Sequence, residues 1–330
     1  MDNQLIIGLD GGGTNTTCIL FDSNGFTMDT IYDKGSNLYV FKDDAIQRIL
    51  FIIRSILEKN KLNYSDISAF GLGIAGISDL DSREKLLKEL DRIKITKQTL
   101  LLSDVEAAYK ILCPNNNGIL INIGTGIICF ARNQKGKNIK EAGNGYDKGD
   151  LGSGYWLGKE MFSRLILNEA IVLEDPEMNQ IFEVVKSNFK VETFRELYQY
   201  IEDNNNIFSY LASLGEDTID LAESGNDVAL SIIQEGTRYV SEYIKSIAEK
   251  MEILNSDVML SINGSIIKNN FYRNLLEESL QYDFNKIHWI SSVLSPAYGA
   301  GIMAGKYKNI NINLTDIIKG VSNWAQLKLL

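Results

Sequence analysis

The stretch LIIGLDGGGTNTTCILFDSNG, residues 5–25, determines the fold that the sequence predicts. Two apolar runs rich in β-branched residues flank a glycine-rich turn, and the second run ends at Asn24-Gly25, which together indicate a β-hairpin. Glycines in such a turn carry no Cβ atom, so their N–H groups can approach an anion such as phosphate. A tight hairpin without a ligand is the alternative interpretation, because glycine-rich turns are common.

The residues of this turn also suggest what it binds. Asp10 ends the first apolar run and stands where a carboxylate could hold Mg²⁺ through water molecules, and Thr14 adds a hydroxyl donor. The pattern is neither a Walker A loop nor a Rossmann fingerprint, since no helix with the required glycine spacing follows. We therefore predict a magnesium ligand at Asp10 and a phosphate-binding turn made of Gly11, Gly12, Gly13, Thr14 and Asn15.

Composition limits the kinds of protein that this chain can be. The 330 residues are enough for two domains, and the net charge of −10 argues against a nucleic-acid partner without excluding a nucleotide. Three distant cysteines, Cys18, Cys113 and Cys129, suit a reduced cytosol, and the single His288 excludes a zinc site with several histidines. The chain shows no signal-peptide pattern and no apolar run of membrane-spanning length, so we expect a cytoplasmic protein without a membrane partner.

One order of elements, βββαβαβα, occurs twice along the chain, and an internal repeat of this size outweighs any single motif. For the first copy, the pattern predicts strands at 5–10, 16–22, 26–33, 67–74 and 98–102, and helices at 43–59, 81–91 and from Val105 to about Leu112. For the second copy, it predicts strands at 118–123, 127–132, 137–142, 257–262 and 287–291, and helices at 155–170, 227–251, near 269–280 and from Pro296. Asp43 or Asp44 is the predicted cap of the first helix.

The repeat predicts two similar α/β domains around a central cleft, 1–115 and 116–330, with a break in the pattern near Pro114. Each copy opens with a strand, a glycine-rich turn and a second strand, so Gly124-Thr125-Gly126 is the counterpart of the first turn. The segment at about 173–225 interrupts the second copy. We interpret it as a helical insertion without chemistry of its own, and a dimer surface is the alternative.

In its duplicated pattern and its motifs the chain resembles the actin, sugar kinase and Hsp70 superfamily, whose domains have a ribonuclease H-like, actin-like ATPase fold. Within that superfamily it is similar to the bacterial BadF/BadG-type family, which includes kinases of N-acetylglucosamine and N-acetylmuramic acid. The motifs that carry the resemblance are DGGGTNT at 10–16, Ser36-Asn37, Ser103-Asp104, Gly124-Thr125-Gly126, the run from Gly145 to Gly154, and Asn263-Gly264-Ser265. In the run that starts at Gly145, Tyr146 stands where these kinases carry a tryptophan and Leu151 where they carry a glutamate.

The resemblance implies a kinase that transfers the γ-phosphoryl group of ATP, with Mg²⁺, to the 6-hydroxyl group of an N-acetylated amino sugar, as in the salvage of cell-wall sugars. Asp104 is then the catalytic base, a role that suits its place at the carboxyl end of an apolar strand, and a helix N-cap is the alternative. The implied nucleotide contacts beyond the first turn are Thr125, Gly126, Gly264 and Ser265. The implied sugar contacts are Asn37, Asp104, Gly145, Tyr146, Asp147 and Asp150.

For several of these residues a plain structural role stays open. Asn37 follows a Gly-Ser turn, where an asparagine often serves turn chemistry, and Asp147 and Asp150 could be solvated loop charges. Gly264 and Ser265 could simply connect a strand to a helix.

The main alternative function is an ATPase of the same wider family that drives a partner protein, like the activators of 2-hydroxyacyl-CoA dehydratases. Those activators hold an iron–sulfur cluster with cysteines from a dimer, whereas the three cysteines here have core-like settings. A sugar-binding regulator would need a helix-turn-helix, and a ROK-type kinase would need a cluster of zinc ligands, and the sequence favours neither. We expect a homodimer whose small-molecule ligands are ATP and an amino sugar.

Overall fold

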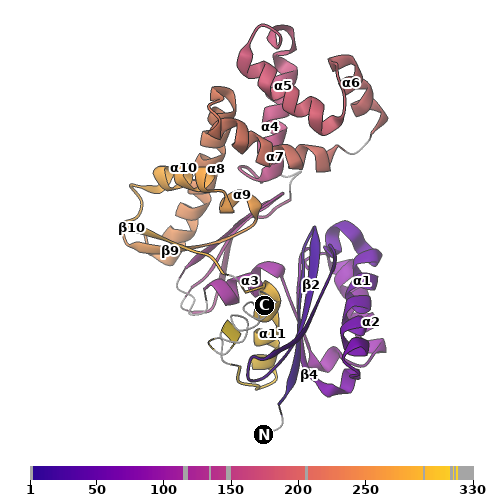
Figure 1. Ribbon diagram of the computed structural model, residues 1–330. Coiled ribbons are helices and arrows are strands. Elements are labelled where there is room, and N and C mark those ends of the chain that lie inside the picture. Colours follow the sequence, from indigo (N-terminus) through magenta and orange to yellow (C-terminus); the bar gives the residue numbers. More distant parts are fainter. Residues whose placement is uncertain are drawn as a thin grey trace, which may run out of the picture. The chain divides into compact units, whose positions relative to one another are not determined.

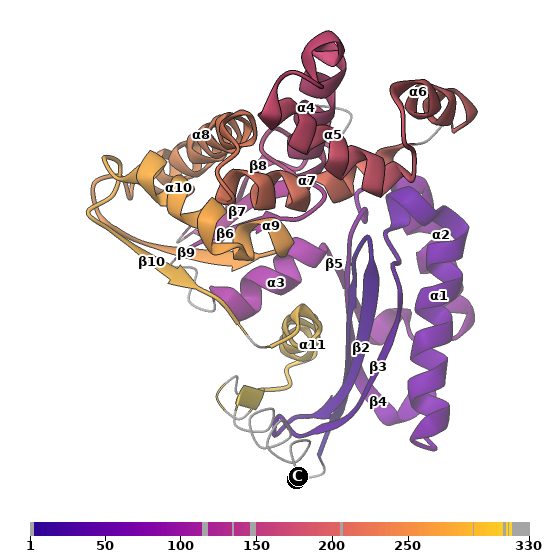
Figure 2. The same cartoon turned by 45° about the horizontal axis from the view of Figure 1, so that its top comes forward.

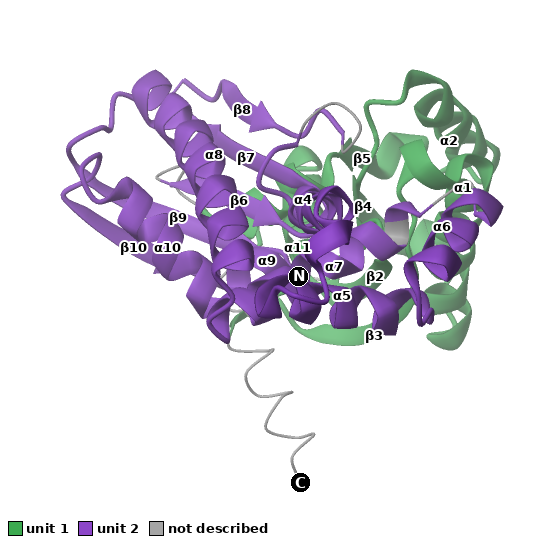
Figure 3. Cartoon of the chain, turned by 90° about the horizontal axis from the view of Figure 1, so that it is seen from above, with its two compact units in different colours: residues 1–114, 292–330 green, residues 115–291 purple. Residues whose placement is uncertain are grey.

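The computed structural model describes residues 3–113, 118–133, 135–145, 150–204, 207–292, 294–312, 315 and 317–318. The chain divides into two compact units (Figure 3). Unit 1 comprises Met1–Pro114 and Ser292–Leu330, and unit 2 comprises Asn115–Ser291. Unit 2 is therefore inserted, along the chain, between the two segments of unit 1. Each unit has its own sheet and its own hydrophobic core.

Unit 1 is built on a five-stranded sheet with the strand order β3-β2-β1-β4-β5. The strands β1 (Leu5–Gly11), β2 (Asn15–Asp22) and β3 (Thr27–Lys34) pair in antiparallel fashion. The strands β4 (Ile67–Ile74) and β5 (Thr99–Leu102) extend the sheet parallel to β1. The carboxyl ends of β1, β4 and β5 therefore lie at one edge of the sheet.

Helices cover both faces of this sheet (Figures 1 and 2). The helices α1 (Leu38–Lys59) and α2 (Leu80–Arg92) lie on one face, and α3 (Asp104–Leu112) and α11 (Pro296–Tyr307) lie on the other. Two short 3-10 helices complete the unit, at Tyr64–Asp66 and Thr96–Gln98.

The alternation of side chains in β1 explains why the sheet needs helices on both sides. Ile7 and Leu9 belong to the core that includes the buried face of α1, whereas Ile6 belongs to a second core that includes residues of α11. Successive side chains of a strand point to opposite faces, and a strand with apolar side chains on both faces must be buried on both.

Glycines in two central strands allow α11 to pack its backbone against the sheet. A Cβ atom on Gly8 would lie 2.0 Å from the carbonyl oxygen of Ala297, and one on Gly71 would lie 2.0 Å from that of Ala300. The Thr27 and Tyr298 hydroxyl groups add a buried hydrogen bond of 2.6 Å. The expected second domain, 116–330, included this helix, but the structure groups Ser292–Leu330 with unit 1 because the glycine-lined surface that fits α11 belongs to β1 and β4.

Unit 2 repeats the plan of unit 1 with the strand order β10-β9-β6-β7-β8. The strands β6 (Ile119–Ile123), β7 (Ile127–Arg132) and β8 (Asn138–Ala142) are antiparallel neighbours. The strands β9 (Asp257–Asn263) and β10 (Lys286–Ile290) are parallel to β6. The same order of pairing in both units confirms the predicted duplicated α/β fold.

The helices of unit 2 pack on this sheet through apolar stripes. The helix α8 (Asp227–Met251) has the bounds that the sequence predicts, contacts β6, β7 and β8, and packs against α10 (Asn270–Leu280). Its buried stripe recurs at helical spacing: Ala229, Ile232, Ile233, Gly236, Val240, Ile244, Ile247 and Ala248. The helix α4 (Gly154–Leu167), the short α9 (Ser265–Lys268) and a 3-10 helix at Glu169–Ile171 complete this part.

Three helices occupy the segment that the sequence analysis interprets as an insertion: α5 (Pro176–Phe189), α6 (Phe194–Asp203) and α7 (Phe208–Glu223). Stacked rings join them, with the Phe182 and Phe194 centroids 4.2 Å apart. The helix α7 packs closely on α4, since a Cβ atom on Gly158 would lie 1.9 Å from the carbonyl oxygen of Leu211.

The helix α1 begins earlier than the sequence predicts. Asn37 is its N-cap and accepts hydrogen bonds from the N–H groups of Tyr39 and Val40, so the predicted cap at Asp43 or Asp44 is wrong. Lys42 has φ 48° and ψ −121°, which separates a first turn from the regular helix that follows. The periodic pattern starts only after this break, and for that reason it indicated a start at residue 43.

Candidate functional site

The candidate site of unit 1 lies at the edge where β1, β4 and β5 end. Functional groups of α/β proteins collect at such carboxyl edges. Asp10 and Gly11 end β1 and lead into the glycine turn, Gly76 follows β4, and Asp104 follows β5. A backbone hydrogen bond of 2.8 Å from the Ala75 N–H group to the Gly11 oxygen joins the first two of these segments.

The turn between β1 and β2 is open to a ligand. The Gly12 N–H group donates to the Asn15 oxygen at 3.0 Å, and Gly13, Thr14 and Asn15 are exposed. A Cβ atom on Gly11 would lie 2.4 Å from the Ser36 hydroxyl oxygen, so packing requires this glycine. A Cβ atom on Gly13 would meet no described atom within 4 Å, so packing does not explain that glycine.

Asn37 lies against a second tight turn. Its Oδ1 atom serves the N-cap of α1, and no described residue accepts a hydrogen bond from its amide nitrogen. A Cβ atom on Gly76 would lie 2.4 Å from Asn37 Oδ1, and Gly76 has φ 73°, so a side chain is excluded on two grounds. Asn37 therefore has the local structural role that the sequence left open, through its Oδ1 atom. The two N–H donors of its amide could bind a ligand.

The residue that caps α3 is Ser103, not Asp104. Ser103 is the N-cap, its hydroxyl group accepts from the Glu106 N–H group at 3.2 Å, and the Glu106 carboxylate accepts from the Ser103 N–H group. The alternative that Asp104 caps this helix is wrong, because Ser103 already forms the capping box. Asp104 is the first residue of the helix and is half-buried.

Two carboxyl groups influence each other at this edge. Burial, and after it the negative charge of Asp104, raise the pKa of Asp10 to about 7. Among the described residues no three His, Cys, Asp or Glu side chains form a metal cluster. Mg²⁺ does not need one, since it is usually held by one or two carboxylates together with phosphate oxygens and water. The pair Asp10 and Asp104, whose repulsion a cation would relieve, fits that ion.

The corresponding turn of unit 2 joins β6 to β7. The Gly124 N–H group donates to the Gly126 oxygen at 3.0 Å, and the Gly154 N–H group at the start of α4 donates to the Gly124 oxygen at 2.8 Å. The Tyr155 N–H group donates to the Thr125 oxygen at 3.0 Å. Thr125 is exposed, and a Cβ atom on Gly124 would meet no described atom, so the two turns are alike in their openness.

Asp150 is not a solvated loop charge. It is 5% exposed, its Oδ1 atom accepts from the Asn144 N–H group at 2.9 Å, and its Oδ2 atom lies 3.6 Å from a Cβ atom placed on Gly126. The structure thus brings Asp150 beside the unit 2 turn. Gly145 is described, with φ 107°, whereas Tyr146 and Asp147 lie outside the described residues.

Gly264 and Ser265 follow β9 as Gly76 follows β4 in unit 1. Gly264 has φ 96°, and a Cβ atom there would lie 2.2 Å from the Ile123 oxygen, so the connection from strand to helix requires a glycine. Ser265 is exposed at the start of α9. The connecting role is real, and contact with adenosine stays a prediction for these two residues.

The three cysteines are buried thiols. Cys18 lies in β2 and Cys129 in β7, and burial raises the pKa of both thiols. Cys113 is the C-cap of α3. Buried thiols at these places do not form the exposed pair that a cluster between two subunits would need. Within the described part of the chain, no helix is long and apolar enough to cross a lipid bilayer.

Two α/β units with one strand order, each with a glycine turn between its first two strands, define an actin-like ATPase fold. The model of the BadF/BadG/BcrA/BcrD ATPase family matches residues 7–304, and the chain belongs to that family.

The similar proteins span nearly the whole chain. The N-acetylmuramic acid/N-acetylglucosamine kinase of Clostridium acetobutylicum is 24% identical over 91% of this chain and 98% of its own length. The N-acetyl-D-glucosamine kinase of Dictyostelium discoideum is 22% identical over 92% of this chain and 98% of its own. Among solved structures, a candidate N-acetylglucosamine kinase from Chromobacterium violaceum is similar in fold, with a TM-score of 0.70 and 18% identity over 91% of this chain and 99% of that one.

Proposed function

We propose that this protein is an ATP-dependent kinase that phosphorylates the 6-hydroxyl group of N-acetylglucosamine, N-acetylmuramic acid or both. The observation that carries the proposal is the carboxyl edge of unit 1, where Asp104 is not the helix cap and interacts electrostatically with Asp10 beside an open glycine turn. Support also comes from the family and from the activities that name the two relatives.

In this proposal Asp104 is the base of the reaction. Its carboxylate accepts the proton of the sugar 6-hydroxyl group while that oxygen forms a bond to the γ-phosphorus atom. The bond between the γ-phosphorus and the bridging oxygen breaks, and ADP leaves with the electron pair. Phosphoryl transfer passes through a loose transition state, so alignment of the hydroxyl group contributes as much as its deprotonation.

The glycine turns of both units are assigned to the phosphates of ATP. Their exposed N–H groups suit anions, and Thr14 and Thr125 add hydroxyl donors. Gly264 and Ser265 are assigned to the adenosine part. Asp10 would hold Mg²⁺, which when bound neutralises the charge of the phosphate oxygens. The residues Asn15 and Gly126 complete the nucleotide set.

The sugar is assigned to groups that match its polar surface. The amide of Asn37 offers two N–H donors, and Asp150, Gly145, Tyr146 and Asp147 complete the set together with Asp104. A site built to pair every hydroxyl and amide of a sugar discriminates strongly against analogues that lack one of them. We also propose that the enzyme is a cytoplasmic homodimer that serves the salvage of cell-wall amino sugars.

The experiment that tests the function follows ADP release with ATP, Mg²⁺ and one of four additions: N-acetylglucosamine, N-acetylmuramic acid, glucose or no sugar. We expect slow release without sugar and strong stimulation by at least one N-acetylated sugar. Fast release that no sugar changes would contradict the kinase and favour an ATPase that acts on a partner. Size-exclusion chromatography with light scattering would test the dimer separately.

A further inference from the structure

Lys42 has a backbone conformation that lysine rarely adopts. Its φ of 48° and ψ of −121° fall in a region that glycine occupies easily and other residues avoid. Such a conformation persists only where the surroundings hold it, and it is concentrated at functional sites. The break places the turn Leu38–Phe41 apart from the regular part of α1.

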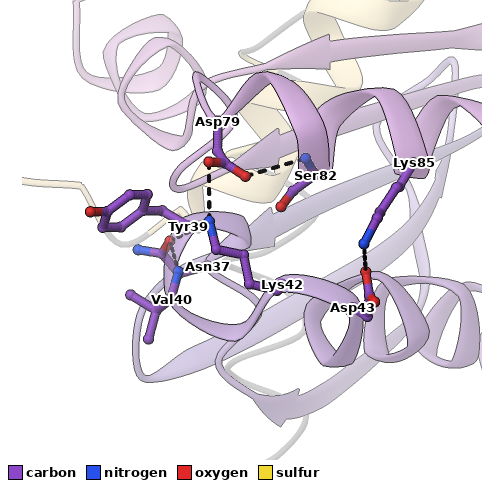
Figure 4. A network of polar contacts seen from close by, with 8 residues as sticks. All are labelled: Asn37, Tyr39, Val40, Lys42, Asp43, Asp79, Ser82 and Lys85. Atoms are coloured by element: carbon purple, nitrogen blue, oxygen red, sulfur yellow. Dashed lines mark hydrogen bonds and ion pairs between the residues drawn. The ribbon is translucent and has the colours of Figure 1, made fainter.

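The side chain of Lys42 is held between two groups (Figure 4). Its Nζ atom lies 3.0 Å from Asp79 Oδ1 and 4.7 Å from the centroid of the Tyr39 ring. The Lys42 side chain is nevertheless 50% exposed, and Tyr39 and Val40 are exposed as well. The ammonium group is thus fixed in place and still accessible to a ligand.

This ammonium group belongs to the sugar end of the candidate site. Asn37, the assigned sugar ligand, accepts a hydrogen bond from the N–H group of Tyr39. The Lys42 ammonium group lies over the ring of the same tyrosine. Asp79 ends the loop that contains Gly76, against which Asn37 packs. Through these contacts Lys42 is tied to the same two loops, one after β3 and one after β4, that position Asn37.

Lys42 is also the one cationic residue within the loops of this edge, and Arg48, from the regular part of α1, contacts them at the Gly35 oxygen and the Phe41 ring. The segments that form the carboxyl edge of unit 1 are 9–15, 35–43, 74–82 and 103–106, and Lys42 is the single lysine or arginine in them. Asp10, Asp79 and Asp104 give this edge a negative character. A substrate with a carboxylate would be repelled here unless a cation received it.

We propose that Lys42 binds the carboxylate of the lactyl ether that distinguishes N-acetylmuramic acid from N-acetylglucosamine, and so gives the enzyme its use of the acidic sugar. The inference rests on the proposed kinase function. An ammonium group has three donors, so Lys42 can bind the lactyl carboxylate while it keeps Asp79. Asp79 also accepts from the Ser82 N–H group at 3.2 Å, so its charge stays partnered if Lys42 moves.

The exposed side chains beside Lys42 fit the rest of the same substituent. Tyr39 is 55% exposed and Val40 is 56% exposed, and both offer apolar surface to the lactyl methyl group. A sugar that presents its 6-hydroxyl group to Asp104 carries its C3 substituent on the other side of the ring. Asp104 follows β5 and the loop that ends at Asp79 follows the neighbouring strand β4, so the two groups come from adjacent segments of the same edge.

The test compares kcat/KM for the two sugars in the wild type and in three variants. Lys42→Gly removes the cation and accepts the positive φ, Lys42→Arg keeps the cation, and Lys85→Met is the matched control. Lys85 forms a similar ion pair, 2.7 Å from Asp43, and its side chain is 56% exposed (Figure 4). Thermal unfolding is measured in parallel, and Lys42→Gly should unfold at a temperature no lower than the wild type.

We expect Lys42→Gly to lower the ratio of kcat/KM for N-acetylmuramic acid to that for N-acetylglucosamine about three- to fivefold, the upper part of the range for one accessible charge pair. Lys42→Arg and Lys85→Met should keep the ratio within about twofold. The methyl ester of N-acetylmuramic acid, which lacks the charge, should be used equally well by the wild type and by Lys42→Gly.

Several results would overturn the inference. They are an unchanged ratio in Lys42→Gly, an equal fall in Lys85→Met, an ester that is as sensitive to Lys42→Gly as the acid, and a wild type that phosphorylates N-acetylglucosamine and never N-acetylmuramic acid. A wild type that phosphorylates neither sugar would instead overturn the proposed function, so the two failures are distinguishable.

Discussion

At the scale of single residues, Ser103 and Asp104 divide two tasks that one aspartate could have performed. The hydroxyl group of Ser103 caps α3, and Glu106 completes the capping box. The carboxylate of Asp104 lies half-buried at the carboxyl edge of the sheet, where its negative charge adds to the effect of burial in raising the pKa of Asp10. A carboxylate that does not cap the helix and lies beside a second carboxylate is well suited to accept a proton from a substrate.

This division predicts opposite outcomes for two neighbouring substitutions. Asp104→Asn should lower kcat by roughly 10²–10⁴, because an amide cannot act as a base, and should leave ATP binding nearly intact. Ser103→Ala should lower stability by about 1 kcal/mol through the lost cap and change kcat far less. Steady-state kinetics, nucleotide titration and chemical denaturation of both variants check this. An Asp104→Asn enzyme with near-normal turnover would remove Asp104 as the base.

Asp10 predicts a pH dependence of stability in the protein without metal or nucleotide. Its pKa of about 7 in the folded state exceeds 3.8, the ordinary pKa of an aspartate side chain. The folded state therefore holds more protons between these values, and the contribution of Asp10 to stability falls as pH rises through that window. The loss of stability caused by burying the Asp10 carboxylate is small below the lower pKa and complete above the upper pKa. Asp10→Asn should therefore stabilise the protein above about pH 7, by at most a few kcal/mol, and have little effect near pH 4.

The measurement is thermal unfolding in a chelator over this pH range, with Asp91→Asn as the control. Asp91 is exposed on α2. We expect the control to change the unfolding temperature by a similar small amount at every pH. If Asp10→Asn destabilised the protein at high pH, the carboxylate would have a partner that compensates for its burial.

At the scale of elements, periodic segments are predicted well and their interruptions are not. The bounds of α8 follow from an apolar stripe that runs without a break from Ala229 to Ala248 in a helix of 25 residues. The first turn of α1 has no such stripe, and the positive φ of Lys42 cannot be seen in the identity of a lysine. Capping by Asn37 depends on a side chain that the sequence assigned only to turn chemistry or to the sugar.

The same distinction applies to the candidate site. The glycine turns could be found because their motif is local in the sequence and their openness follows from the missing Cβ atoms. The importance of Gly76 could not, since it depends on contact with Asn37, which is 39 positions away by their residue numbers. The packing of α11 on the sheet of unit 1 was not predicted either. Gly8 and Gly71, which interrupt strand patterns, were a signal that another backbone approaches closely.

Two glycines in unit 1 predict two separable effects. Gly71→Ala places a methyl group 2.0 Å from the Ala300 oxygen, and because that neighbour is backbone the variant should lose roughly 1–3 kcal/mol of stability. Gly13→Ala meets no described atom and should unfold like the wild type, while its KM for ATP rises because the methyl group stands where phosphate approaches. Denaturant titration measures the stability of both variants, and steady-state kinetics with ATP measures their KM. An unchanged KM in Gly13→Ala would contradict a phosphate role of the turn.

At the scale of the whole molecule, the chain enters unit 2 once and returns to unit 1, so both ends of unit 2 are continuous with unit 1. The two units nevertheless have separate sheets and cores, so we expect the opening of each unit to expose its own buried residues. The rate at which a thiol reagent labels Cys18 measures the opening of unit 1, and the rate for Cys129 measures the opening of unit 2. Each thiol is fully buried within the sheet of its unit.

The proposed assignment of ATP phosphates to turns of both units predicts that nucleotide protects both thiols. With Mg²⁺ and ADP at about 100 times the dissociation constant, openings that release the nucleotide should become about 100-fold rarer, and labelling of Cys18 and Cys129 should slow by similar factors. Peptide mass spectrometry after a thiol reagent in mild denaturant measures the two rates and separates them from Cys113. Gly13→Ala should weaken the protection of both thiols, since the weaker nucleotide binding is shared. Protection of one thiol alone would mean that a single unit binds the nucleotide, and the assignment of the other turn would then be wrong.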